Sequence, residues 1–228
     1  MKKIITCLVA LFAVALVSGC SINLPIGPTR EANSTGGNQI DKFVKEKNPG
    51  DNVSTKGALA KNGKLILFIE NKNDKPVKMD IEVEFYDDGN KLVKSGKDSL
   101  TGVRANSEVA IEIYDTPEKY ADYKIFVDAE YDDYLVFDKE LEMTDNNTGE
   151  EVAVQVTNNS EDNIDWISVS VVYYKDKIPV GISEGLESDI KPGRSANFNI
   201  GYAYDKNYDD VEFDDYKVFI NEAYSYVY

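Results

Sequence analysis

The acidic segment near the end of the chain holds the residues whose types and spacing come closest to a metal site. Asp205, Asn207 and Asp209 alternate as the first oxygen ligands of a calcium-binding loop do. The pattern then breaks, because Asp210 stands where such a loop needs glycine and Tyr216 stands where it needs glutamate. The sequence therefore favours a solvated acidic loop without a metal, with a weak calcium site at the first three residues as the alternative.

A second group of carboxylates lies around the middle of the chain. It comprises Asp87, Asp88, Asp132, Asp133 and Asp138. Glycoside hydrolysis needs two carboxylates about 5–9 Å apart in a cleft, and no insertion in the sequence would build one. The chain contains no histidine, which excludes an imidazole base, a histidine-based triad and a histidine-containing zinc site. It has no glycine-rich phosphate loop and no Cys-x-x-Cys pair. We therefore expect a protein that is not an enzyme and has no cofactor.

Tyrosine offers a third kind of chemistry, with 15 residues in the chain. Tyr224, Tyr226 and Tyr228 alternate, so a strand would place all three on one face. An exposed strip of this kind can stack on sugar rings or anchor a protein partner, and we take these tyrosines as possible ligand-binding residues. The alternative is that they fill a core and close a sheet edge. Trp166, at the start of a predicted strand, is expected to pack in a core.

The first residues are typical of a secretion signal. Met1-Lys2-Lys3 is a basic head, and Ile4 to Val17 is an apolar run of 14 residues, shorter than the ~20 that span a membrane. Val17-Ser18-Gly19-Cys20 resembles the bacterial lipobox. The resemblance implies that residues 1–19 are removed, that diacylglycerol is attached to the Cys20 sulfur, and that acyl chains such as palmitate hold the protein at the extracellular face of the cell membrane. An ordinary secretory signal is the alternative.

The charge balance limits the possible partners. Lys and Arg total 25 against 41 Asp and Glu, a net charge of −16 that becomes −18 once Lys2 and Lys3 leave with the signal peptide. This balance repels phosphate and excludes nucleic acid as a partner. It also attracts basic partners over long range, an effect that salt weakens. Cys7 would leave with the signal and Cys20 would carry lipid, so the fold cannot depend on disulfides.

The remaining chain divides into a linker and a region of strands. Residues 20–55 are predicted to be a lipidated N-terminus and flexible linker, because they hold prolines and glycines but few apolar residues. Farther along, apolar and polar residues alternate with a period of two in Met79 to Phe85, Val109 to Ile113 and Tyr123 to Val127. This alternation is typical of strands with one buried face, and Asp88-Gly89-Asn90 is a hairpin signal. We expect an all-β fold.

The strand pattern occurs twice. The corresponding segments are Leu65 to Asn71 with Val152 to Asn158, Val83 to Asp88 with Val171 to Asp176, Val109 to Ile113 with Ala196 to Ile200, and Asp122 to Val127 with Asp215 to Ile220. The duplication predicts two tandem immunoglobulin-like antiparallel β-sandwich domains, at residues 56–132 and 133–228.

Short motifs recur at equivalent places in both copies. They are Asn71 with Phe85-Tyr86-Asp87, and Asn158 with Tyr173-Tyr174-Lys175. Lys191-Pro192-Gly193 adds a turn before a strand of the second copy, where the first copy departs with Arg104-Ala105-Asn106. Together these motifs resemble the tandem FxLYD-type sandwich domains of bacterial surface lipoproteins. The resemblance implies an extracellular sandwich with a binding role and no catalytic residues.

These features predict a lipid-anchored protein that binds or spaces partners in the cell envelope, with a protein as the expected partner. The alternative is a carbohydrate- or cell-wall-binding module that uses the aromatic residues of the second domain.

Overall fold

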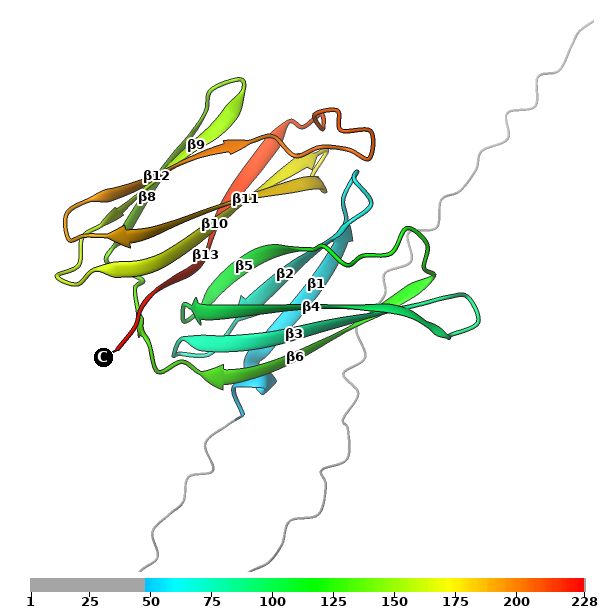
Figure 1. The fold of residues 1–228 in the computed structure, drawn as a ribbon, viewed down its shortest axis with the longest axis horizontal. Helices are drawn as coiled ribbons and strands as arrows, with labels where there is room; N and C mark the ends of the chain where they lie inside the picture. Colours follow the sequence, from blue (N-terminus) through cyan, green and yellow to red (C-terminus); the bar gives the residue numbers. More distant parts are fainter. Residues whose placement is uncertain (1–47, 228) are drawn as a thin grey trace, which may run out of the picture. The chain divides into compact units, whose positions relative to one another are not determined.

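The computed structural model describes residues 48–227, which belong to one unit built almost wholly of antiparallel strands (Figure 1). In chain order the elements are the 3₁₀ helix η1 (Pro49–Asn52) and the strands β1 (Val53–Leu59), β2 (Leu65–Asn71), β3 (Val77–Tyr86), β4 (Leu92–Val103), β5 (Ser107–Ile113), β6 (Asp122–Tyr131), β7 (Leu135–Val136), β8 (Leu141–Asn147), β9 (Glu151–Asn158), β10 (Ile164–Lys175), β11 (Ile178–Ile190), β12 (Ser195–Gly201) and β13 (Asp215–Ser225). The prediction of an all-β antiparallel sandwich fold is confirmed. The predicted signal peptide, Cys20 and most of the predicted linker lie outside the described residues. Within residues 48–227, no helix is long and apolar enough to cross a bilayer.

Strand pairing divides the described chain into two halves of the same topology. In the first sandwich, the sheets β1-β2-β5 and β4-β3-β6 face each other. In the second sandwich, β12-β9-β8 faces β11-β10-β13, to which the short β7 is added. Strands β1 to β6 therefore correspond in order to β8 to β13, which agrees with the duplication seen in the sequence.

The alternating residues form the cores of the two sandwiches. Met79, Ile81, Val83 and Phe85 of β3 are each at most 2% exposed, and their polar neighbours face outward. Their counterparts on β10 include Ile167, Val169 and Val171, the latter two fully buried. Because successive side chains of a strand point to opposite faces, the alternation in the sequence is sufficient to place these residues inside.

The hairpin between β3 and β4 forms where the sequence signal predicted it. The Asn90 amide donates to the Asp87 carbonyl at 3.0 Å, and Asn90 has a φ of 60°. Asparagine tolerates this left-handed conformation better than most residues. Asp176 and Lys177 take positive φ values in the equivalent hairpin of the second sandwich.

Buried asparagines hold the same loop in each sandwich. The Nδ2 group of Asn71 donates to the carbonyls of Lys75 and Val103 at 3.2 and 3.3 Å. Asn158 makes the equivalent bonds to Asp162 and Ile190 at 2.9 and 2.8 Å. Both side chains are fully buried, so each satisfies backbone groups that would otherwise lie unpaired away from water. The two motif asparagines are therefore structural residues.

The turn before the fifth strand of each sandwich also matches. Gly193 has a φ of 69° after Lys191-Pro192, and Asn106 has a φ of 51° after Arg104-Ala105. Asparagine thus fills the left-handed position that glycine fills in the second copy. The departure from the sequence motif leaves the turn geometry unchanged.

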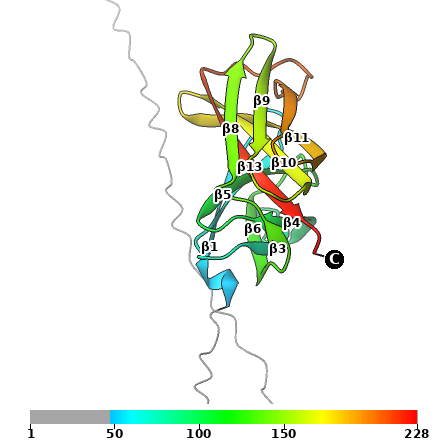
Figure 2. The ribbon, with the colours of Figure 1, turned by 90° about the vertical axis from the view of Figure 1, so that its left-hand side faces the viewer.

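A third apolar cluster joins the two sandwiches. Ile66, Phe68 and Ala110, on the outer face of β1-β2-β5, pack with residues of the outer face of β11-β10-β13. The latter are Val172, Ile182 and Phe219. The four sheets are therefore layered, with β8 and β9 toward one end and β3 and β6 toward the other (Figure 2). We call this contact the joint.

A β-bulge completes the joint with hydrogen bonds. Ser168 pairs with Glu222 and Val169 with Ile220, so Asn221 is left out of the ladder. Its side chain turns to the other sandwich, where Oδ1 accepts from the Ala110 amide at 3.1 Å and Nδ2 donates to the Ala110 carbonyl at 2.9 Å. The amide of Asn221 thus pairs with a backbone edge as a neighbouring strand would.

Two described elements lie partly or wholly before residue 56, the predicted start of the first domain. η1 occupies residues 49–52 and β1 begins at Val53. η1 is tied down because the Asn73 side chain donates to the Pro49 carbonyl at 3.0 Å and the Lys72 amide donates to the Asn52 carbonyl at 2.9 Å.

Candidate functional site

The calcium candidate is a self-contained hairpin loop. Asp205 Oδ1 accepts from the amides of Asn207 and Asp209 at 2.7 and 3.2 Å, and the Asp205 amide donates to the Asp209 carbonyl at 2.8 Å. The hydrogen bonds from Asn207 hold the pKa of Asp205 below its usual value. Within residues 48–227, no three Asp, Glu, Cys or His side chains are grouped as metal ligands. Asp205 therefore uses its carboxylate to shape the loop.

The second group of carboxylates is not brought together. Asp87 and Asp88 follow Tyr86 at one end of β3, whereas Asp132 and Asp133 follow Tyr131, which pairs with Val77 at the other end. Ten residues of strand separate these ends by about 30 Å. These carboxylates therefore do not form the close pair that glycoside hydrolysis needs, because they lie at opposite ends of a long hairpin.

The tyrosine strip is only partly exposed. Tyr224 is 8% exposed and stacks on Tyr134, with ring centroids 5.3 Å apart and 12° between planes. Tyr226 is 45% exposed and meets both rings edge-on at 5.5 and 5.7 Å. Burial raises the pKa of Tyr224 well above its usual range. Tyr228 lies outside the described residues. The exposed part of this aromatic cluster consists of Tyr226 and Tyr134. Sequence reasoning missed Tyr134, because it lies 90 residues from Tyr224, on which it stacks.

Trp166 is not a core residue, contrary to the sequence-based expectation. It is half-buried outside the core clusters, on the same face of its sheet as its pairing partner Tyr224. Its indole Nε1 donates to Glu222 Oε2 at 3.2 Å, while Glu222 Oε1 accepts from the Thr101 amide of the first sandwich at 2.7 Å. Alternation within β10 accounts for this face, because Ile167 and Val169 point into the core and Trp166 therefore points outward.

The sequence also contains two short motifs of acyl-transfer enzymes that the prediction of a non-enzyme passed over. Gly181-Ile182-Ser183-Glu184-Gly185 matches a nucleophile elbow by letter, and Ser188-Asp189-Ile190-Lys191 matches Ser-x-x-Lys. The first lies within the extended strand β11, whereas an elbow requires a sharp turn from strand to helix. With no histidine in the chain to act as base, we assign no catalytic role to Ser183.

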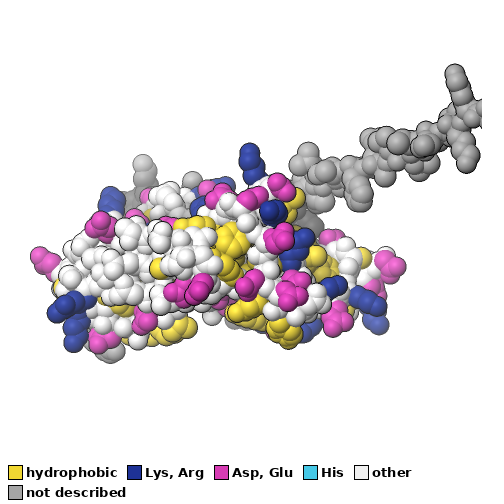
Figure 3. All heavy atoms as spheres, turned by 90° about the horizontal axis from the view of Figure 1, so that it is seen from above, with side chains coloured by type: hydrophobic (Ala, Val, Ile, Leu, Met, Phe, Trp, Pro, Cys, Tyr) yellow, Lys and Arg dark blue, Asp and Glu magenta, His cyan; other side chains and the backbone are white. Residues whose placement is uncertain are grey.

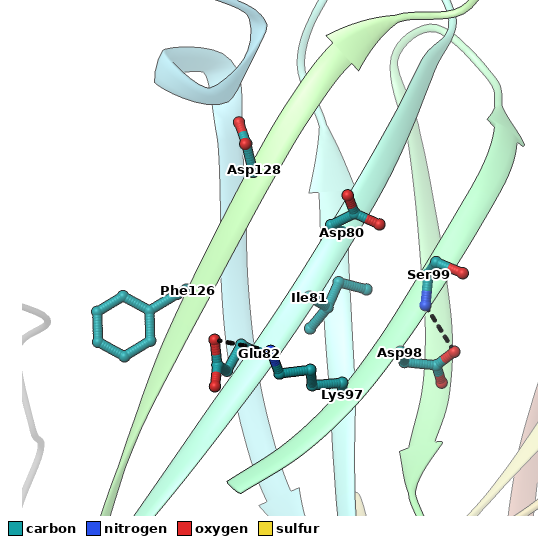
Figure 4. Close-up of a pocket in the computed structure, with 8 residues that line it drawn as sticks. All are labelled: Asp80, Ile81, Glu82, Lys97, Asp98, Ser99, Phe126 and Asp128. Atoms are coloured by element: carbon teal, nitrogen blue, oxygen red, sulfur yellow. Dashed lines mark hydrogen bonds and ion pairs between the residues drawn. The ribbon is translucent and has the colours of Figure 1, made fainter.

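A shallow depression of about 630 Å³ lies on the outer face of β4-β3-β6 (Figure 4). Asp80 and Asp128 stand directly opposite each other there, and Lys97 Nζ lies 3.6 Å from Glu82 Oε2. Phe126 is 43% exposed beside them. Like charges paired across strands are destabilising, so Asp80 and Asp128 favour a solvated face. The same negative charge would repel another acidic surface.

That face corresponds by the repeat to the joint face of the second sandwich. Phe126 has the place of Phe219, which is 3% exposed. Where the joint face carries Ser170, Val172 and Asn221, the open face carries Glu82, Glu84 and Asp128. The charges explain why one face is buried between sandwiches and its counterpart is solvated.

A carboxylate cluster marks one side of the joint. Glu184 of β11 accepts from the Glu112 amide of β5 at 3.4 Å. Glu184 is an exposed residue at the rim of the joint. Partial desolvation there raises its pKa to about 7, and the nearby charges of Asp98 and Glu112 add to the effect. Burial also raises the pKa values of Glu112 and Asp98. This side of the joint is therefore easier to close when Glu184 is protonated.

A second depression, of about 760 Å³, lies on another side of the joint and draws its walls from both sandwiches. We call it the seam pocket. Arg104 of the first sandwich lies in it with 18% of its side chain exposed, 3.4 Å from Asp138. Burial lowers the pKa of the Arg104 guanidinium. Apolar side chains complete the walls: Leu141, Met143, Val218, Phe219 and Ile220.

Acidic side chains are spread along the face shown in Figure 3, with hydrophobic side chains gathered near its middle. The seam pocket differs from such a surface because three cations, Arg104, Lys139 and Lys217, line it together with an equal number of carboxylates. In a chain of net charge −16, it is a place where an anionic group meets less repulsion.

No model of a protein family matches the chain. A search of curated proteins also found no match.

Proposed function

We propose that the protein is a lipid-anchored protein of the extracellular face of the cell membrane that binds or spaces partners in the envelope and catalyses no reaction. The joint between the sandwiches carries this proposal. It buries an apolar cluster and the Asn221–Ala110 amide pair, so the two sandwiches act as one body that presents its surfaces in a constant arrangement. Such a body suits an extracellular binding module or spacer.

The anchor in this proposal is Cys20, in the lipobox-like Val17-Ser18-Gly19-Cys20. Two or more acyl chains give stable membrane attachment where a single chain gives only reversible binding. The resemblance of the repeated motifs to FxLYD-type surface lipoproteins supports the same placement.

Metabolic labelling with palmitate tests the anchor. Wild-type chain should carry label in the membrane fraction, and Cys20→Ala should carry none. Cys7→Ala is the matched control, because it changes the other cysteine of the chain, and it should label as wild type does. Unlabelled wild-type chain would refute lipid anchoring.

Affinity capture with the full chain in detergent, on envelope from its own cells, tests the binding role. We expect a protein partner with a basic surface, because the net charge of −16 attracts cations. Capture should weaken as salt is raised. Turnover of any envelope substrate by the purified chain would contradict the proposal that it is not an enzyme.

A carbohydrate- or cell-wall-binding role is the second candidate, favoured by one observation. Tyr134 and Tyr226 expose 37% and 45% of their surface next to each other, as a sugar-stacking surface requires. Binding to a glycan array or to peptidoglycan that disappears in Tyr226→Ala would support it. Tyr208→Ala, which changes a tyrosine that is 87% exposed elsewhere, is the control.

A further inference from the structure

Strand β13 has a free edge beside the seam pocket. On one side it pairs with β10 from Asp215 to Tyr224. On the other side its only strand partner among residues 48–227 is β7, at Tyr224 and Ser225. The backbone from Asp215 to Glu222 therefore has a strand on one side only, and the groups of such an edge are available to an added strand.

The second sandwich is also open between β13 and β8. Met143 pairs with Val156, so its side chain lies on the core side of its sheet. Nevertheless Met143 is 36% exposed. The Tyr216 hydroxyl donates to Asp145 Oδ1 at 2.7 Å and bridges the two edge strands. Along this opening, Met143 and Val218 offer apolar contacts at the free edge of β13.

The equivalent side of the first sandwich is occupied. There η1 lies against β6, with Gly50 close to the Val127 carbonyl. Val127 packs onto the core of that sandwich. The second sandwich has no corresponding helix among the described residues, since Phe137 to Glu140 leads from β7 to β8 without one. The opening is therefore a feature of one copy of the repeat.

Arg104 stands at the end of the free edge and is incompletely satisfied. Its Nη1 lies 3.4 Å from Asp138 Oδ1, and its Nη2 lies 3.5 Å from the Ile220 carbonyl, both at the long limit for hydrogen bonds. Its buried Nε has no hydrogen-bond partner within the part of the chain that the structure describes. A buried guanidinium with such weak partners gains from a carboxylate that it can hold through two parallel hydrogen bonds.

We propose that an extended peptide adds to the free edge of β13 in the seam pocket and that Arg104 binds its C-terminal carboxylate. β7 occupies the edge from Tyr224 onward, so an added strand must end near Ile220, where Arg104 stands. A strand running parallel to β13 places its C-terminus at this end. Its side chains would alternate between the apolar wall at Met143 and Val218 and the solvent.

This inference rests on the proposed binding function and names the chemistry of the partner. The peptide carboxylate would compete with Asp138, which is 47% exposed and can turn to solvent. Two lysines also line the pocket. Lys217 is ion-paired with Glu108 at 2.8 Å, so Lys139 adds the further positive charge near the incoming carboxylate. Backbone hydrogen bonds would supply affinity, and the guanidinium would select a chain end.

Fluorescence polarisation with the full chain in detergent tests the proposal. The probe is a pool of labelled octapeptides that alternate valine and threonine and end in a free carboxylate. Two comparison pools end in an amide, and one of these carries an internal glutamate. We expect the free carboxylate to bind at least tenfold more tightly than either amide. Arg104→Met should lose that difference, and Arg194→Met, at an exposed arginine in the second sandwich, should keep it.

A second variant keeps the test valid if Arg104→Met weakens the joint. Met143→Glu places a carboxylate in the opening at a partly exposed position and should weaken binding without unfolding the chain. The proposal is overturned by equal binding of the three pools, by no binding of the carboxylate pool at about 1 mM, or by wild-type binding in both variants. Capture of an envelope partner by Arg104→Met as efficiently as by wild type would overturn this site and leave the proposed function standing.

Discussion

Replacing Asn221 with alanine should separate the contribution of the joint from that of the two cores. Asn221 is 3% exposed and lies outside both core clusters. Its amide makes two hydrogen bonds to Ala110 across the joint. Asn221→Ala removes both and leaves the Ala110 amide without a partner, whereas the Ala110 carbonyl keeps its bond from the Ser170 hydroxyl at 2.8 Å.

The expected loss follows from these contacts. A buried donor left unsatisfied costs about 1–3 kcal/mol, and the lost second hydrogen bond costs about 1 kcal/mol. We therefore expect the free energy of unfolding to fall by about 2–4 kcal/mol. For a chain of this size, each kcal/mol lowers the thermal midpoint by about 2–4 °C.

Urea unfolding followed by tryptophan fluorescence is a suitable assay. Trp166 is the only tryptophan of the chain, and its hydrogen bond to Glu222 places it beside the joint. Asn199→Ala, at an exposed asparagine on β12, is the matched control and should change stability by less than about 0.5 kcal/mol. If Asn221→Ala unfolds at the same urea concentration as this control, the hydrogen bonds between Asn221 and Ala110 do not stabilise the protein.

Further predictions concern the loops, the joint and the acidic groups. Asn158→Ala should lower the free energy of unfolding by about 3 kcal/mol, measured in urea, because its four hydrogen bonds satisfy buried loop groups. Gly102→Ala should cost about 1–3 kcal/mol for its φ of 68°, and more because the new Cβ would lie 2.9 Å from Tyr224. The raised pKa of Glu184 favours the folded protein below its ordinary value of 4.5, and this stabilisation is lost as pH rises through about 7. Glu184→Gln should therefore raise the thermal midpoint at about pH 8 and leave it nearly unchanged at about pH 5. The gain in free energy of unfolding at about pH 8 should be about 1 kcal/mol at most, because solvent screens the charge. Calcium or a chelator should leave the thermal midpoint unchanged, because Asp205 already accepts hydrogen bonds within its own loop.

Each of these predictions has a result that contradicts it. Gly193→Ala shares the positive φ but meets nothing within 4 Å, so equal losses at Gly102 and Gly193 would show that the contact with Tyr224 is unimportant. If the thermal midpoint of Glu184→Gln equals that of wild type at every pH, the carboxylate cluster does not affect the stability of the joint. A calcium-dependent rise of several degrees would restore the metal site at Asp205. An Asn158→Ala chain as stable as wild type would show that water replaces the amide.

Strand positions and core faces could be predicted because they depend on local alternation. The alternation in β3 and β5 placed the same residues inside that the structure buries. One informative pattern in β2 does not alternate. Leu65 to Ile69 is apolar at every position, and all five side chains are at most 8% exposed. Such a run is typical of a strand buried on both faces, and it would have predicted that β2 lies between two layers.

The candidate site was less predictable. Tyr224 and Tyr226 share an aromatic cluster, but Tyr134 completes it and Tyr224 is buried. Asp87 and Asp205 accept hydrogen bonds within their own loops. Asp132 and Asp138 instead meet distant groups, the Gly102 amide and the Arg104 guanidinium. Arg104 drew attention in the sequence only as a departure from a turn motif, because its environment is built by residues 34 and 116 positions away.

The sequence by itself determined the all-β class, the faces of the main strands and the duplication, since each follows from a period of two or from a repeated order of short segments. Only the tertiary structure decided which outer faces meet, how the bulge turns Asn221 toward Ala110, and where the seam pocket opens. Those features join residues as far apart as 116 positions. Their energy comes from the desolvation and pairing of groups that no local pattern relates.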